Sequence, residues 1–451
     1  MRRICLALLI AVVVAGCSVE SPPRPEPAPT AAVPETPVAQ APPVQVAPVA
    51  PAPKVVKEGA SLRLVGLPNV ESVRWAPSGQ TALVGGYRLR LDTLELTAVP
   101  PEGTGMHLGW SGPNEALLFH WDKDGTSIGE LSLQTGEVRT LATVPSRHTV
   151  SLCQSGADWV WVEVQAVRQG GAGAREIGAV YRTPAPSPAI GSAPLALGGE
   201  KVMARGALLG RLADGSCLLD DLEQQLFLAR PSGALEKIAQ GFALPQITRD
   251  GRGVTWREGE EGECADCIEL GSGVPFQRLA WWRLDGPKLT ADLGKPQRMT
   301  VLQSPDGKRL IIGHRVTGEA GAAISVLSAA GFQRGEVRSP ALEPLGWMGT
   351  DLLLHAAAPE GWTYGSPILR AADGAHVADW LTMSYDGSLV VRVNGEVRYL
   401  TPDGTSYRLA NAEPFPATGG GITPVSEYQA GVPYVAVRQA DGGLLIRLEA
   451  P

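Results

Sequence analysis

The chain has 451 residues, enough for two or three average domains or for one large all-β domain with accessory segments. It contains 54 glycines and 38 prolines but only 6% aromatic residues, and long helical patterns of apolar residues are hard to find beyond residue 17. This composition favours the all-β alternative. The formal net charge is −7, or −9 without Arg2 and Arg3 (37 basic against 46 acidic residues), and no basic stripe offsets it. The acidic balance argues against a nucleic-acid partner.

Residues 1–16 form the first predicted element, an export signal. Arg2 and Arg3 precede an apolar run that ends near Val14, and this run is too short to span a bilayer as a mature helix. The stretch "VAGC" that ends at Cys17 resembles the bacterial lipobox, in which a signal peptidase cuts before the Cys and the thiol carries a diacylglycerol. The resemblance implies lipidation of Cys17 and a membrane anchor. The anchor would hold the protein at the outer face of the plasma membrane or, in a diderm cell, at the periplasm-facing side or the outer membrane. The alternative is an ordinary cleavage site near Cys17.

Residues 17–59 are expected to form a disordered tether. From residue 21 to residue 54 there are twelve prolines with Ala and Val between them, which favours extended polyproline II over packing. At about 3.1 Å per residue, such a segment reaches up to roughly 100 Å. A Pro-rich ligand for a partner domain is the alternative, but the prolines are irregularly spaced.

Residues 60–451 repeat one phrase, a polar corner containing Gly followed by an apolar strand. In "SPDGKRLIIGH", Pro305 presets φ, Asp306 bonds its own following backbone and Gly307 takes positive φ, so this phrase predicts a hairpin corner rather than a working site. The corners are "WAPSGQTALVGG" (75–86), "WSGPNEALLFH" (110–120), "CQSGADWVWVEV" (153–164), "LADGSCLLDDL" (212–222), "TRDGRGVTWRE" (248–258), "SPDGKRLIIGH" (304–314), "WMGTDLLLHAA" (347–357), "SYDGSLVVRV" (384–393) and "YQAGVPYVAVR" (428–438).

A second phrase alternates with these corners, namely a strand, a short polar turn and another strand, as in "GELSLQTGEVRTLA" (129–142). Two hairpins per repeat make four antiparallel strands, and the corners recur about every 44 residues, the range of a propeller blade. Such a small sheet cannot bury both of its faces alone, so blades are expected to stack around an axis. The sequence therefore predicts a single all-β propeller of four-stranded antiparallel blades.

The phrases "SPDGKRLIIG", "SYDGSLVVRV" and "WAPSGQTALVGG" resemble the propeller repeat of TolB-like proteins of the bacterial surface and periplasm. The resemblance covers most of residues 60–451, but the corners at residues 153, 347 and 428 lack Asp-Gly. Nine blades would be more than usual, so eight are favoured, with seven as the alternative. The segment "SLRLVGL" (61–67) precedes the first full repeat and the last unit is short of one strand, so we expect the N-terminal strand to complete the last blade.

Two short motifs partly match known catalytic or metal-binding patterns. "GTSIG" (125–129) fits the G-x-S-x-G nucleophile elbow, but Ser127 is followed by a strand and a hairpin rather than a helix, which argues against a catalytic role. Asp122, Asp124 and Glu130 offer oxygen ligands at incomplete calcium-loop spacing, so a solvated hairpin loop is favoured. We predict no catalytic residue, no metal site and no cofactor.

The histidines and tryptophans are interpreted structurally. No two of the six histidines lie at ligand spacing, so no zinc site follows and most are expected to be exposed. These histidines are His107, His120, His148, His314, His355 and His376. The pairs Trp159 with Trp161 and Trp281 with Trp282 are expected in the core, because both faces of a blade are buried, with a carbohydrate surface as the alternative.

Four cysteines remain besides Cys5 of the leader and Cys17, an even number for an exported protein. Cys264 and Cys267 form C-A-D-C within the acidic insertion 258–273, and a local disulfide between them is favoured over a redox pair or a metal site. Cys153 and Cys217 remain for a second disulfide, or as further metal ligands if the fold brings them close.

The sequence thus predicts a membrane-anchored, extracytoplasmic lipoprotein. By the resemblance, its propeller, expected to be monomeric, serves as a binding or scaffolding module for a protein or peptide partner at the cell envelope. The alternative is a propeller enzyme that acts on glycan or peptide substrates at the mouth of its channel.

Overall fold

The computed structural model describes residues 52–67, 70, 72–100, 105–122, 125–144, 150–170, 173–186, 194–221, 223, 225–258, 277–294, 296–316, 321–338, 342–356, 365–384, 386–410, 424, 426, 429, 431–439 and 442–450. In these residues every regular element is a strand. No helix long and apolar enough to cross a membrane occurs within these ranges. The prediction of an all-β propeller of antiparallel blades is confirmed by the strand pairings.

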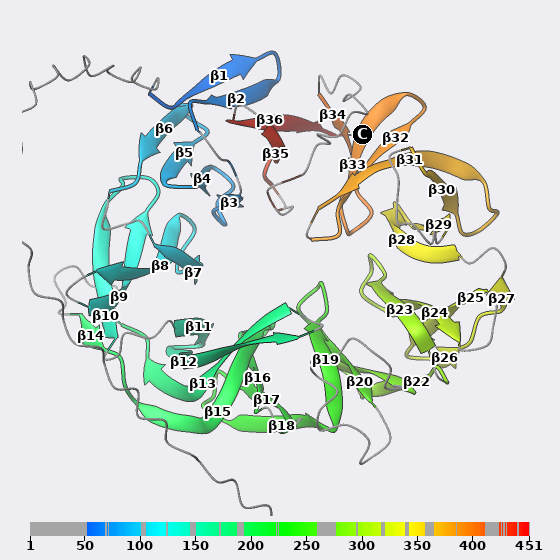
Figure 1. Cartoon of the computed structure of the whole chain (residues 1–451), viewed down its shortest axis with the longest axis horizontal. Coiled ribbons are helices and arrows are strands. Elements are labelled where there is room, and N and C mark those ends of the chain that lie inside the picture. The colour runs from blue at the N-terminus through cyan, green and yellow to red at the C-terminus, as the bar shows by residue number, and fades with distance from the viewer. Residues whose placement is uncertain are drawn as a thin grey trace, which may run out of the picture. The chain divides into compact units, whose positions relative to one another are not determined.

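The first two blades each contain four antiparallel strands in chain order, starting at the inner edge of the ring (Figure 1). Blade 1 contains β3 (Val73–Trp75), β4 (Thr81–Val84), β5 (Tyr87–Arg90) and β6 (Glu95–Ala98). Blade 2 contains β7 (Met106–Trp110), β8 (Glu115–Asp122), β9 (Gly125–Ser132) and β10 (Val138–Val144), and β14 (Leu195–Ala196) pairs with β10.

Blades 3 and 4 share one strand. Blade 3 contains β11 (Val150–Ser155), β12 (Asp158–Gly170), β13 (Gly173–Pro184) and β15 (Glu200–Arg211). Blade 4 continues with β16 (Cys217–Asp220), β17 (Gln225–Ala229) and β18 (Leu235–Gln240). β15 pairs with β13 through its first half and with β16 through its second half, so it is the outer strand of blade 3 and the inner strand of blade 4.

The next four blades include a second shared strand. Blade 5 contains β19 (Phe242–Ile247), β20 (Gly253–Glu258), β21 (Arg278–Arg283) and β22 (Leu289–Asp292). Blade 6 contains β23 (Pro296–Gln303), β24 (Arg309–Val316), β25 (Ala322–Ser328), β26 (Gly331–Gln333) and β27 (Val337–Arg338). Blade 7 contains β28 (Leu342–Met348), β29 (Asp351–Ala356), β30 (Pro367–Arg370) and β31 (His376–Met383), and blade 8 adds β32 (Leu389–Val393), β33 (Glu396–Leu400) and β34 (Ser406–Leu409). The shared strand is β31, which pairs with β30 of blade 7 and β32 of blade 8.

A closing blade joins the two ends of the folded chain. β35 (Tyr434–Gln439) and β36 (Gly442–Glu449) come from the C-terminal end, and β2 (Ser61–Val65) pairs with β36, as predicted. β1 (Lys54–Glu58) adds to β2. The folded unit thus begins before residue 60, the boundary expected from the sequence, because the turn at Gly59 folds Val55 and Val56 back onto β2.

Each predicted corner lies between two consecutive strands of one blade, except that the last lies between the bridge at Pro424 and β35. The described pairings therefore follow nine successive units, and the favoured count of eight is not confirmed. At the corner of blade 6, Gly307 has φ 69°, and the hydroxyl of Ser304 donates to Asp306 Oδ1 at 2.5 Å while the Lys308 backbone N–H donates to the same oxygen at 3.1 Å. These contacts identify it as a structural corner.

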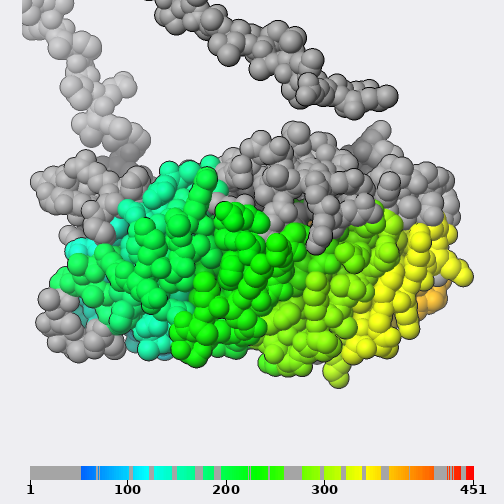
Figure 2. Space-filling model, turned by 90° about the horizontal axis from the view of Figure 1, so that it is seen from below, coloured from blue at the N-terminus to red at the C-terminus, as the bar shows by residue number. Residues whose placement is uncertain are grey.

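The core lies between blades rather than within any single blade. Eight apolar clusters of buried residues each join two successive blades, and two of them flank the closing blade. Trp159, Trp161 and Trp281 are buried in this core, and Trp282 packs partly buried against it, which confirms the structural interpretation of the Trp pairs. Figure 2 shows the resulting wall, which runs without a break from the green blades to the yellow ones.

Candidate functional site

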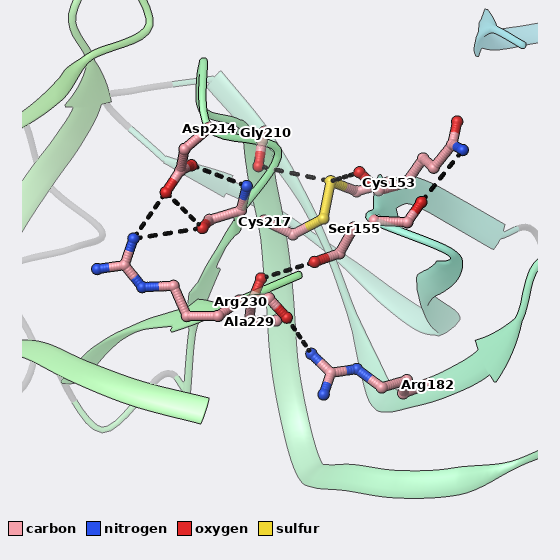
Figure 3. The surroundings of a disulfide bond; sticks show 11 residues. Cys153, Ser155, Arg182, Gly210, Asp214, Cys217, Ala229 and Arg230 are labelled. Atoms are coloured by element: carbon pink, nitrogen blue, oxygen red, sulfur yellow. Dashed lines mark hydrogen bonds and ion pairs between the residues drawn. A yellow bond between two sulfur atoms is a disulfide. The ribbon is translucent and has the colours of Figure 1, made fainter. Parts of the chain in front are cut away.

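A disulfide joins Cys153 of β11 to Cys217 of β16, and therefore joins blade 3 to blade 4 (Figure 3). Both residues are buried in the apolar cluster between these blades. Nearby, the Ser155 hydroxyl donates to the carbonyl oxygen of Ala229 at 3.0 Å, a second link between the same blades. Cys17, Cys264 and Cys267 lie outside the described residues.

The catalytic and calcium motifs are accounted for by the sheet of blade 2. Ser127 lies within β9, opposite His120 on β8 and Thr143 on β10, so no strand-to-helix elbow forms around it. Glu130 of the same strand accepts hydrogen bonds from Ser111 Oγ at 2.7 Å and from Arg139 Nε at 2.7 Å. Glu130 therefore forms an ion pair with Arg139 within blade 2 and has a structural role. Asp124 lies outside the described residues.

The expectation that most of the histidines are exposed is wrong for the described residues, where His376 is exposed, His107 and His120 are half-buried, and two more are buried. His314 and His355 are 1% and 5% exposed. His314 Nε2 lies 3.0 Å from Ser325 Oγ, and His355 Nε2 lies 3.9 Å from Glu343 Oε2. Each follows an apolar run on the second strand of its blade, and this recurrence in "LIIGH" and "LLLH" was the available sequence signal. His148 lies outside the described residues.

The buried charges of blades 5 to 7 have partners of opposite charge. Glu343, whose side chain is 6% exposed, lies 3.8 Å from Arg315 of the preceding blade. Glu258, at the end of β20, accepts a hydrogen bond from the Trp256 indole at 2.9 Å and pairs with Lys288. The Glu343 carboxylate thus links blade 7 to blade 6, whereas the contacts of the Glu258 carboxylate lie within blade 5.

Arg74 differs from these charged groups. It lies on β3, the inner strand of blade 1, and is exposed, while Val73 and Trp75 on either side are buried toward the closing blade. Its guanidinium Nη1 lies 2.9 Å from Nδ1 of His107 on β7, the inner strand of blade 2. Within the described part of the chain, no carboxylate forms an ion pair with Arg74.

His107 is held in its neutral form. Burial, and secondly the charge of Arg74, lowers the pKa of His107 from 6.5 to about 4. At neutral pH its Nδ1 therefore accepts a hydrogen bond from Arg74, and its proton sits on Nε2, a buried atom with no hydrogen-bond partner among the described residues. Neutral His107 orients the guanidinium without reducing its charge.

The inner strand of blade 2 is irregular beside this pair. The register shifts between His107 and Gly109, so a β-bulge interrupts the ladder with β8. Gly109 has φ 154°, and a Cβ added there would meet no atom within 4 Å apart from its chain neighbours Leu108 and Trp110. The ring of Trp110 lies 4.8 Å from that of His107 at 62°. The bulge thus leaves open space at Gly109, on the strand that carries both His107 and Trp110.

The candidate site consists of Arg74, His107, Gly109 and Trp110, at the inner edge where blades 1 and 2 meet. Sequence reasoning did not bring these residues together. Arg74 and His107 are 33 positions apart and belong to different repeats, so only the stacking of blades makes them neighbours. The arrangement offers hydrogen-bond donors and a positive charge, and His107 at this pKa is a weak base at neutral pH.

No family model and no curated protein matches the sequence. Among solved structures, the protein is similar to dipeptidyl peptidase 4 of Porphyromonas gingivalis (10% identity over 78% of this chain and 60% of that one, TM-score 0.41). It is also similar to BamB of Moraxella catarrhalis (11%, 87% and 99%, TM-score 0.36) and to an oligogalacturonate lyase in complex with manganese (14%, 88% and 96%, TM-score 0.35). Because these TM-scores are low, the fold assignment rests on the strand pairings.

Proposed function

We propose that the protein is an exported lipoprotein whose propeller binds a protein or peptide partner at the cell envelope. Cys17 carries the lipid, and the Pro-rich segment after it holds the propeller away from the membrane. The Cys153–Cys217 disulfide supports the extracytoplasmic location, because disulfides persist mainly in oxidising compartments.

One observation carries the binding role. The Arg74 guanidinium is exposed at the inner edge of the ring, and the group it contacts is a neutral imidazole. A charge with no counterion among the described residues is available for recognition of a second molecule. No nucleophile or strong base accompanies it among the described contacts, so the pair suits binding better than bond cleavage.

The test is crosslinking of the full-length lipidated protein in its own membranes, followed by affinity capture and mass spectrometry of the crosslinked peptides. The expected result is one recurrent protein partner whose crosslinks fall on blades 1 and 2. Recovery of a small molecule or glycan alone would overturn the proposal. Mass spectrometry of the mature N-terminus tests the anchor separately, because an unlipidated protein that starts after residue 17 would contradict it.

A further inference from the structure

The guanidinium of Arg74 is oriented by a neighbouring side chain, but no carboxylate among the described residues balances its positive charge. A guanidinium has five N–H donors, and the contact with His107 Nδ1 uses one of them. Other arginines of blades 1 and 2 have oxygen partners, as Arg139 has in Glu130. Arg74 is therefore distinct among the described arginines of these two blades.

His107 fixes the direction in which Arg74 is presented. Its neutral imidazole accepts one hydrogen bond from the guanidinium, and Trp110 packs against its ring. An acidic residue in this place would hold the arginine equally well but would cancel its charge. A buried neutral histidine fixes the orientation of the guanidinium and leaves its positive charge unbalanced.

The bulge provides room for a ligand. The strand that carries His107 departs from regular pairing at Gly109, where a Cβ would touch nothing within 4 Å outside the two chain neighbours. Bulges next to binding sites commonly re-aim side chains in this way. The open space, the oriented cation and the aromatic ring are all contributed by the inner strands of two adjacent blades.

We propose that Arg74, positioned by His107, binds a carboxylate of the partner at the inner edge of blades 1 and 2. The inference rests on the proposed binding function and adds the partner's chemistry, an acidic peptide segment. The carboxylate belongs either to an Asp or Glu side chain or to the C-terminus of the partner. An anionic segment is an unexpected ligand for a protein of net charge −7, so binding must depend on this local cation rather than on overall attraction.

The test uses fluorescence anisotropy at physiological salt with two labelled peptides. Hexaglutamate with an amidated C-terminus presents only the carboxylates of its side chains, and hexaserine with a free C-terminus presents only the terminal carboxylate. One of them should bind the full-length protein, and Arg74→Gln should weaken that binding by about tenfold or more, as expected for loss of a charge-assisted hydrogen bond. Arg90→Gln is the matched control, since Arg90 lies on the same blade but already pairs with Asp92 at 2.8 Å. No binding of either peptide, or equal losses in Arg74→Gln and Arg90→Gln, would overturn the proposal.

The positioning role of His107 is tested with two further variants. His107→Gln keeps a hydrogen-bond acceptor and should retain binding within about threefold, whereas His107→Leu should lose about as much as Arg74→Gln. Melting curves of both variants show whether they are folded, and equal binding by His107→Leu and wild type would contradict the assigned role. If Arg74→Gln captures the envelope partner as efficiently as wild type, the carboxylate inference is overturned but the binding function is not. If wild type captures no protein, the binding function itself is overturned.

Discussion

Leu62 of β2 lies directly opposite Leu445 of β36, so residues near the two ends of the folded chain are partners in one sheet. Both are buried, at 2% and 0% exposure, in the cluster that packs the closing blade against blade 1. The pairing leaves no gap between the last repeat and the first.

Removal of β2 should destabilise the whole ring. Deletion of residues 52–67 removes Leu62, Leu64 and Leu67 from the buried cluster, and each buried leucine contributes on the order of 3 kcal/mol. We expect the melting temperature, measured by circular dichroism, to fall by roughly 10 °C or more. Deletion of residues 52–59 alone is the control, because β1 is largely exposed and its loss leaves β2 paired with β36. Equal melting of the longer deletion and wild type would contradict closure by β2.

Loss of the Cys153–Cys217 disulfide should weaken the contact between blades 3 and 4. The bond closes a loop with a sequence separation of 64, for which chain entropy predicts a stabilisation of about 4 kcal/mol. The double variant Cys153→Ser/Cys217→Ser should therefore unfold at lower denaturant concentration than the oxidised wild type. A reductant should lower the stability of the wild type toward that of the variant. Unchanged stability of the variant would show that the bond contributes nothing.

The stability of the protein should depend on His107 between pH 6.5 and pH 4. Burial, followed by the charge of Arg74, lowers the pKa of His107 in the folded state to about 4. Between pH 6.5 and pH 4, His107 is therefore protonated in the unfolded protein but neutral in the folded protein. Stability therefore falls as the pH drops below 6.5 and levels off below about 4, by about 3 kcal/mol in all. Urea unfolding of His107→Gln should show a flatter pH profile than wild type. His376→Gln, at an exposed position of β31, is the control, and parallel profiles of His107→Gln and wild type would refute the prediction.

The corner of blade 6 should respond to acid through Asp306. The Ser304 hydroxyl, and then the Lys308 backbone N–H, hold the pKa of Asp306 below 3.8 by hydrogen bonding to the ionised carboxylate. The folded state therefore gains from ionised Asp306 above pH 3.8 and loses this gain as the pH falls through the lowered pKa. Asp306→Ala should cost about 1 kcal/mol at pH 7 in urea unfolding and little at pH 2. An equal cost at both pH values would show that the carboxylate charge is not involved.

The sequence predicted the corners well because each corner depends on a few adjacent residues. Pro305, Asp306 and Gly307 act through local φ preference and hydrogen bonding, which need no knowledge of the rest of the protein. The number of blades was harder to predict, because β15 and β31 each run through two sheets and the sequence does not show where one sheet ends and the next begins.

The candidate site was beyond prediction for a different reason. Arg74 alternates with buried Val73 and Trp75 and looks like any polar residue of a half-buried strand. Its relation to His107 depends on how far two blades turn about the axis, and this is decided by the apolar residues packed between them, such as Leu83 and Leu118. The predicted lipid anchor of Cys17 and the predicted Cys264–Cys267 bond remain predictions.

The hairpin of β1 and β2 decides how the ring would respond to mechanical load on the N-terminal segment. Tension enters at Lys54, whose partner Val65 lies at the open end of the hairpin, so the five pairs of β1 and β2 would separate in sequence from that end. β2 would keep its separate ladder with β36 during this peeling. Under such a load, β1 would therefore detach from β2 before the pairing of β2 with β36 is broken and the ring opens.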